Sequence, residues 1–188
     1  MRLRIYSVLV LLTQACGAHG QTPPAAKLTA FTLARAGNKF VSPKAKDRIT
    51  QIHSEKSTDG LTPDVWYVEY YDPTTAFKRT EVKFMGGKMA EIRQPKHLLD
   101  SFSGTKQLSW RKLKIDSDRA LAIALAEPGL KKLELQSVQF WLERTVIGSS
   151  WRLRFWTNRL GKPGQQSEVG DLYISSGTGE ILKRDLHF

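Results

Sequence analysis

The chain has 188 residues, and its 29 lysines and arginines against 18 aspartates and glutamates give a formal net charge of +11 at pH 7. A hydrophobic fraction of 40% allows a real core in one compact domain or two small ones. The excess of positive charge favours anionic partners such as lipid headgroups, nucleic acid or acidic polymers. It also fits a solvated basic surface, which we prefer because no run of five or six basic residues occurs.

The first 20 residues have the form of a secretory signal peptide, with a basic start, a short apolar run and then small residues. Ala18 and Gly20 favour cleavage before Gln21. A competing cleavage precedes Cys16, where residues 12–16 resemble a bacterial lipobox and would lead to a lipid anchor. Cys16 is the only cysteine, so the folded part has no disulfide bond. We therefore expect an exported bacterial protein, periplasmic or secreted, or else lipid-anchored through Cys16.

Residues 21–40 are interpreted as a leader that contains one short strand or helix over residues 28–36. A first folded unit is expected over residues 41–93. It opens with a predicted helix over residues 41–53, capped by Ser42, whose buried face would carry apolar residues at helical spacing. These are Ala45, Ile49 and Ile52.

Alternating apolar residues then predict three strands in this unit, over residues 64–71, 77–85 and 88–93. Two glycines, Gly86 and Gly87, separate the last two strands and predict a tight hairpin turn. Residues 94–114 are interpreted as a linker or crossover, extended over residues 108–114.

A second unit is expected over residues 115–188, and it opens with the best predicted helix, over residues 115–127. Asp116 is its predicted cap, and its small alanines, such as Ala124, would let it pack close to a sheet. Strands are predicted over residues 131–143, with a bulge near residues 136–137, and over residues 151–158. A loop over residues 161–166 and a hairpin turned by Gly177 and Gly179 complete the unit.

The order of helix and strands therefore recurs in the two halves, with little residue identity between them. This pattern predicts an α+β fold made of two tandem units, each with one helix packed on a small antiparallel β-sheet.

The second half resembles the PepSY domain family. The resemblance lies in the helix that starts at Ile115 and Asp116 and in the sequence Thr-Gly-Glu-Ile-Leu over residues 178–182. Where the family has an aspartate before this sequence, the chain has Ser175. The resemblance covers about residues 115–183 and only weakly residues 41–93. It implies an exported module that inhibits or chaperones proteases, and it brings no catalytic residue.

No catalytic or metal-binding pattern is found in the sequence. The four histidines do not have the spacing of metal ligands, and phosphate-binding or nucleophile motifs are absent. We therefore expect no enzyme activity, no cofactor and no metal.

The candidate binding residues are Arg152, Arg154 and Trp156, which share one face of a predicted strand. Two guanidinium groups beside an indole can hold anionic or aromatic groups. In the alternative interpretation Trp156 packs under a neighbouring strand and the arginines pair with Glu134 or Glu143.

Together these observations predict a non-enzymatic PepSY-like interaction module that binds a protein or peptide partner in the cell envelope. The alternative is a basic domain that binds an anionic polymer or lipid headgroups at a membrane surface. No specific recognition of nucleic acid is expected.

Overall fold

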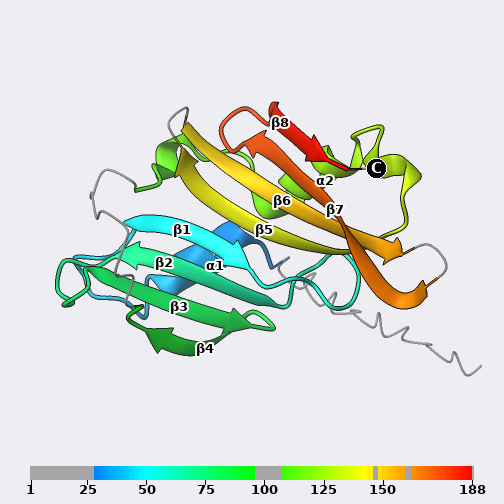
Figure 1. The fold of residues 1–188 in the computed structure, drawn as a ribbon. Coiled ribbons are helices and arrows are strands. Elements are labelled where there is room, and N and C mark those ends of the chain that lie inside the picture. The colour runs from blue at the N-terminus through cyan, green and yellow to red at the C-terminus, as the bar shows by residue number, and fades with distance from the viewer. Residues whose placement is uncertain (1–27, 96–106, 146–147, 160–161, 188) are drawn as a thin grey trace, which may run out of the picture.

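The fold is built on one antiparallel sheet of eight strands, shown by a computed structural model that describes residues 28–95, 107–145, 148–159 and 162–187 (Figure 1). Across the sheet the strands lie in the order β4-β3-β2-β1-β5-β6-β7-β8. Their bounds are β1 (Ile49–Ser54), β2 (Val65–Tyr71), β3 (Arg79–Met85), β4 (Lys88–Arg93), β5 (Leu135–Thr145), β6 (Gly148–Arg159), β7 (Lys162–Ser175) and β8 (Ile181–Leu186).

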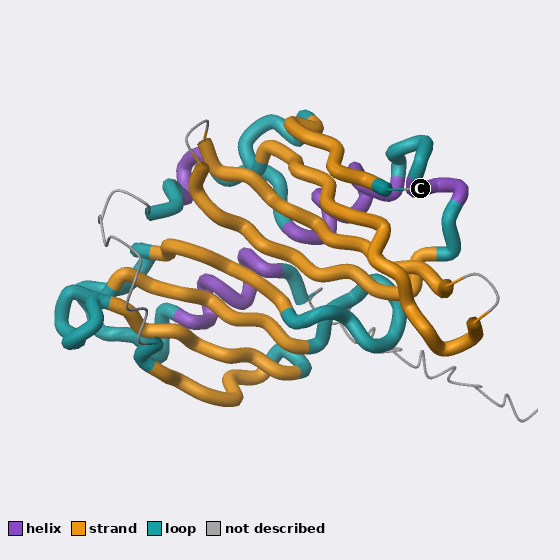
Figure 2. The backbone as a smooth tube through the Cα atoms, in the orientation of Figure 1, coloured by secondary structure: helices purple, strands orange, loops and turns teal. Residues whose placement is uncertain are grey.

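Two short helices, α1 (Ala30–Gly37) and α2 (Ser117–Leu125), lie on the same side of this sheet (Figure 2). The first packs on β1 and β2, and the second packs on β6 and β7. Alanines such as Ala34 and Ala124 are fully buried in these two helices. Because their side chain is only a methyl group, each helix can lie close to the strands. Two 3-10 turns, η2 (Trp110–Lys112) and η3 (Leu130–Lys132), precede and follow α2.

The predicted fold of two tandem units, each with its own small sheet, is wrong. Each half does run from a helix to four strands, but β1 pairs with β5 and joins all eight strands in one predominantly β fold. The junction is antiparallel, with Ile52 opposite Leu142 and His53 opposite Trp141. Alternation along a segment shows which residues share a face, but it does not show which distant strand becomes the neighbour.

The predicted helix over residues 41–53 is also wrong, since its second half is strand β1. The register shifts between Ile49 and Gln51, so both Ile49 and Ile52 are buried on the same side of the sheet. Because this bulge places apolar residues three apart on one face, it imitates the spacing of a helix. Ser42 does not cap a helix; its hydroxyl donates to the carboxylate of Asp72.

The helix of the first half lies earlier, in the range interpreted as a leader. Its cap is Thr29, whose hydroxyl accepts a hydrogen bond from the backbone of Thr32. The predicted signal peptide, with Cys16, Ala18 and Gly20, lies outside the described residues, as does most of the predicted linker.

Several local predictions are confirmed. Helix α2 has Asp116 as its cap, and Gly86 and Gly87 turn the β3–β4 hairpin with φ angles of 55° and 76°. The predicted bulge lies in β5, where the register shifts between Leu135 and Ser137.

Most of the loop predicted over residues 161–166 belongs instead to β7, which pairs with β6. Pro163 and Gly164, which predicted a loop, lie within this strand. The segment predicted as extended over residues 108–114 contains the η2 turn.

The turn between β7 and β8 packs against α2 and against Ile115, which precedes this helix. Gly179 has a φ angle of 84°, and a Cβ atom there would lie 3.1 Å from the side chain of Ile123 and 3.4 Å from that of Ile115. Glycine is required both by the backbone conformation and by the space. The two segments that carry the PepSY resemblance are therefore in contact.

Candidate binding face

The two faces of the sheet are distinguished by the contacts of Tyr70 and Trp151 with the helix side. The Tyr70 hydroxyl donates to the carbonyl of Ala34 in α1 at 2.6 Å, and the Trp151 indole donates to the carbonyl of Ile115 before α2 at 2.8 Å. Side chains alternate along a strand, so the residues next to these two point the other way. In the part of the chain that the structure describes, no helix covers that opposite side, which we call the open face (Figure 1).

One continuous row of directly paired residues crosses the open face from edge to edge. Each residue is the register partner of the next in the neighbouring strand. From β4 to β8 this cross-strand row consists of Glu91, Lys83, Tyr67, His53, Trp141, Arg152, Tyr173 and Lys183. Opposite residues of an antiparallel pair have Cβ atoms about 4.5–5.5 Å apart, so neighbouring side chains of the row lie next to one another.

Aromatic rings and cations stack along this row. The guanidinium carbon of Arg152 lies 4.1 Å from the centre of the Trp141 ring. The imidazole of His53 stacks on Tyr67, with 4.8 Å between ring centres and 12° between planes. Lys183 lies over Tyr173 at 5.4 Å. Such cation–π and stacking contacts hold both the rings and the charges in defined positions.

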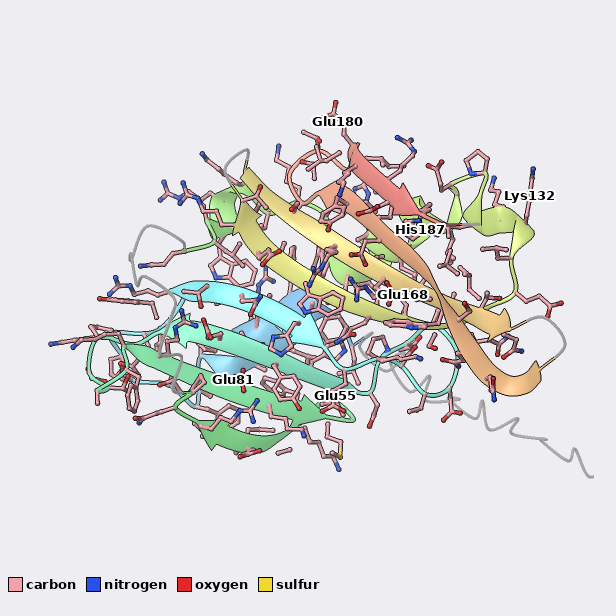
Figure 3. All side chains as sticks on the ribbon, in the orientation of Figure 1. Glu55, Glu81, Lys132, Glu168, Glu180 and His187 are labelled. Atoms are coloured by element: carbon pink, nitrogen blue, oxygen red, sulfur yellow. The ribbon has the colours of Figure 1, made fainter. Side chains whose placement is uncertain are left out.

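Most of the charge on the open face is paired. Arg79 binds Glu69 at 3.0 Å, and Lys183 binds Asp185 at 2.8 Å. Two further pairs join Arg93 to Glu81 and Lys83 to Glu55. Figure 3 labels Glu55 and Glu81 on the side of the sheet that faces away from the helices. The face therefore carries many charges, but most of its cations are paired with a carboxylate.

The three candidate residues predicted from the sequence do share the open face, but their main contacts differ. Arg154 donates two hydrogen bonds to the carboxylate of Asp171, at 2.7 and 2.9 Å, and this bonding raises the pKa of its guanidinium. The amine of Lys56 lies 4.4 Å from the ring centre of Trp156. Arg152 stacks on Trp141, and the guanidinium carbon of Arg154 lies 5.8 Å from the centre of the same ring. The sequence had predicted Glu134 or Glu143 as alternative partners, and Arg154 pairs instead with Asp171 on β7.

Sequence reasoning missed the centre of this face, Trp141, together with His53. The signal for Trp141 was available, since it alternates with the buried Phe140 and Leu142 and therefore points to the other side of β5. His53 could not be found, because its segment had been interpreted as a helix.

His53 and Arg152 flank Trp141 in the row, and both carry a buried nitrogen without a hydrogen-bond partner. These atoms are Nδ1 of His53 and Nε of Arg152. Burial, together with the charge of Arg93, lowers the pKa of His53 to about 4 against the opposing effect of Glu69 and Glu55. The imidazole is therefore neutral at pH 7.

A cleft of about 520 Å³ lies away from this row, between η2 and the β7–β8 turn. Its lining includes Lys112 and Arg144 with several serines, one carboxylate, Glu180, and no histidine or cysteine. In this lining the hydroxyl of Thr178 donates to the carboxylate of Glu180 at 3.1 Å, and both side chains are exposed. Among the described residues there is also no group of three or more metal-binding side chains.

Comparisons with protein-family models, with curated proteins and with solved structures found no match to this chain. None of the helices in the described ranges is both long and apolar enough to cross a membrane.

Proposed function

We propose that this chain is an exported, non-enzymatic binding module of the bacterial cell envelope, and that its open face binds a protein partner. The observation that carries the proposal is the cross-strand row, in which Trp141 and Tyr173 flank Arg152 on a face that no described helix covers. Tyrosine, tryptophan and arginine are the residue types enriched where protein interfaces gain most of their binding energy.

The pairing of charges favours a protein over a polyanion as the partner at this face. Binding of a polyanion depends on cations that release its counterions. On the open face five ion pairs, such as Arg79 with Glu69 and Arg154 with Asp171, already use many of the cations internally. A surface of aromatic rings within a network of paired charges is instead typical of the polar but complementary surface of a protein interface.

The sequence supports the location and the class of partner. Residues 1–20 resemble a signal peptide, and the PepSY resemblance of residues 115–183 supports an exported protease as the kind of protein that is bound and modulated. The sequence contains no recognised catalytic or metal-binding motif, which supports a role in binding rather than in catalysis.

The proposal is tested by affinity capture from an envelope extract of the source cells. Three immobilised proteins are compared: the wild type, Trp141→Ala on the open face, and Arg119→Ala on the exposed side of α2 as a matched control. We expect a protein that is captured by the wild type and by Arg119→Ala, and lost with Trp141→Ala at unchanged folding. A directly titrated complex with the purified partner completes the test, and equal affinity for the Trp141→Ala variant would refute the open face as the site.

The net charge of +11 supports a second candidate function, binding of an anionic polymer or membrane surface. Ionic strength separates the two. Polymer or vesicle binding should weaken steeply as salt rises, since the logarithm of the affinity falls with the logarithm of the salt concentration. Binding of a protein through the aromatic row should depend on salt much less, and a steep salt dependence that survives Trp141→Ala would favour the polymer.

A further inference from the structure

We infer that Arg152 receives a carboxylate of the bound partner, an aspartate or glutamate side chain, in the middle of the cross-strand row. This inference rests on the proposed function, because it names the chemistry by which the open face recognises its partner.

The first observation is that Arg152 has no carboxylate of its own. The other two cations of the row are paired, Lys83 with Glu55 and Lys183 with Asp185. None of the Arg152 nitrogens donates a hydrogen bond to a described residue, and its Nε is buried. A guanidinium group that is partly withdrawn from water without an anion is unfavourable, and the contact with Trp141 offsets only a part of this.

The second observation is the position of Arg152 between two aromatic rings, Trp141 on β5 and Tyr173 on β7. The contact with Trp141 holds the guanidinium plane in place, so that it is preorganised for the two parallel hydrogen bonds that a carboxylate accepts. Because an aromatic surface lies on both sides, the carboxylate belongs within the partner segment rather than at its end. This favours an acidic side chain over a chain terminus.

The charge around Arg152 favours one negative charge over two. Glu143 lies on the diagonal position of β5 and Asp171 on that of β7, where Asp171 is bound by Arg154. Glu143, which forms no ion pair with a described residue, would repel a phosphate dianion more than a carboxylate. The partner segment is therefore acidic at one residue, with apolar or aromatic residues on either side.

The inference is tested with a displayed library of random peptides, selected separately on purified wild type, Arg152→Glu, Lys132→Glu and Trp141→Ala. Lys132→Glu changes the net charge by the same amount, and Lys132 points outward from the η3 turn at the margin of the molecule (Figure 3). We expect one aspartate or glutamate to be enriched among apolar residues on wild type and on Lys132→Glu. On Arg152→Glu we expect lysine or arginine in its place.

A double-mutant cycle with one selected peptide then assigns the contact. Replacing its acidic residue by the neutral amide should weaken binding to wild type at least about tenfold, or about 1.4 kcal/mol. On Arg152→Gln the same replacement should change binding less than about twofold, while amidating the peptide C-terminus should have no effect on either protein. Urea unfolding confirms that each variant is folded.

The outcomes separate the inference from the proposed function. If the peptides bind Trp141→Ala as well as wild type, or if no peptide is enriched on wild type over Trp141→Ala, the open face is not the site and both fail. If Trp141→Ala abolishes binding but the acidic residue contributes equally on Arg152→Gln and wild type, the face binds peptides and only the role of Arg152 is refuted. Sensitivity to C-terminal amidation would assign the carboxylate to a chain terminus and overturn the inference in its stated form.

Discussion

The carboxylate of Asp116 holds the starts of both helices, and its removal tests how the two halves are joined on the helix side of the sheet. One oxygen, Oδ1, accepts from the backbone of Ser117 at 2.7 Å and from the backbone of Phe31 in α1 at 3.1 Å. The neighbouring Ser117 hydroxyl accepts from the backbone of Ala30 at 3.0 Å. The sequence predicted the cap of α2, but not the bond to α1, which lies 85 residues away in the chain.

We expect Asp116→Ala to cost about 2–4 kcal/mol of unfolding free energy. Loss of an N-cap costs about 1 kcal/mol, and a donor left without its partner, here the backbone N–H of Phe31, costs about 1–3 kcal/mol. For a protein of this size such a loss lowers the midpoint of thermal unfolding by on the order of 5–15 °C. The matched control is Asp116→Asn, whose amide oxygen accepts the same hydrogen bonds and whose loss of charge near the helix start costs about 0.3–1 kcal/mol.

Urea unfolding followed by tryptophan fluorescence is the appropriate assay, because Phe31 of α1 contacts two tryptophans. Its ring centre lies 5.4 Å from that of Trp110 and 6.2 Å from that of Trp151. Loosening of α1 should therefore change the emission of the folded protein as well as the midpoint. Equal losses for Asp116→Ala and Asp116→Asn, or a loss below about 1 kcal/mol for Asp116→Ala, would refute a carboxylate that bonds both helices.

Three further predictions concern the faces and edges of the sheet. Ala124→Glu should cost several kcal/mol of unfolding free energy, because a carboxylate would be buried without a partner. At the exposed Ala122 the same change should be nearly neutral. Comparable urea midpoints for the two variants would mean that the wrong face of α2 is assigned. Gly170→Ala should cost at least about 1–3 kcal/mol, because φ is 117° and the new Cβ atom would lie 2.1 Å from the carbonyl oxygen of Asp185; an unchanged midpoint would contradict the pairing of β7 with β8. The pKa of His53 is lowered from 6.5 to about 4, so the unfolded chain binds this proton at a higher pH than the folded protein does. The wild type should therefore lose up to about 3 kcal/mol of unfolding free energy as pH falls from 6.5 to 4. His53→Gln should lack this loss in urea unfolding measured across that range, and parallel pH profiles of the two proteins would refute the burial of the imidazole.

The candidate site could be predicted from the sequence only in part. The alternation of residues 151–158 placed Arg152, Arg154 and Trp156 on one face, and the structure has them there. Their partners lie on other strands, however, and these depend on register. Arg154 finds Asp171 because β6 and β7 pair in the register that places them opposite each other.

Local sequence was sufficient for features whose energetics are local. The cap and alanines of α2 and the turn at Gly86 and Gly87 follow from interactions within a few residues, so the pattern alone predicts them. Only the tertiary structure decided that Ile49–Ser54 is a strand. The spacing of Ile49 and Ile52 is that of a helix face, but a bulge lets both residues be buried on one side of the sheet. It also decided that β1 lies beside β5 and so places His53 next to Trp141. That choice depends on the competition among all strands for a common core, and no segment of the chain carries it alone.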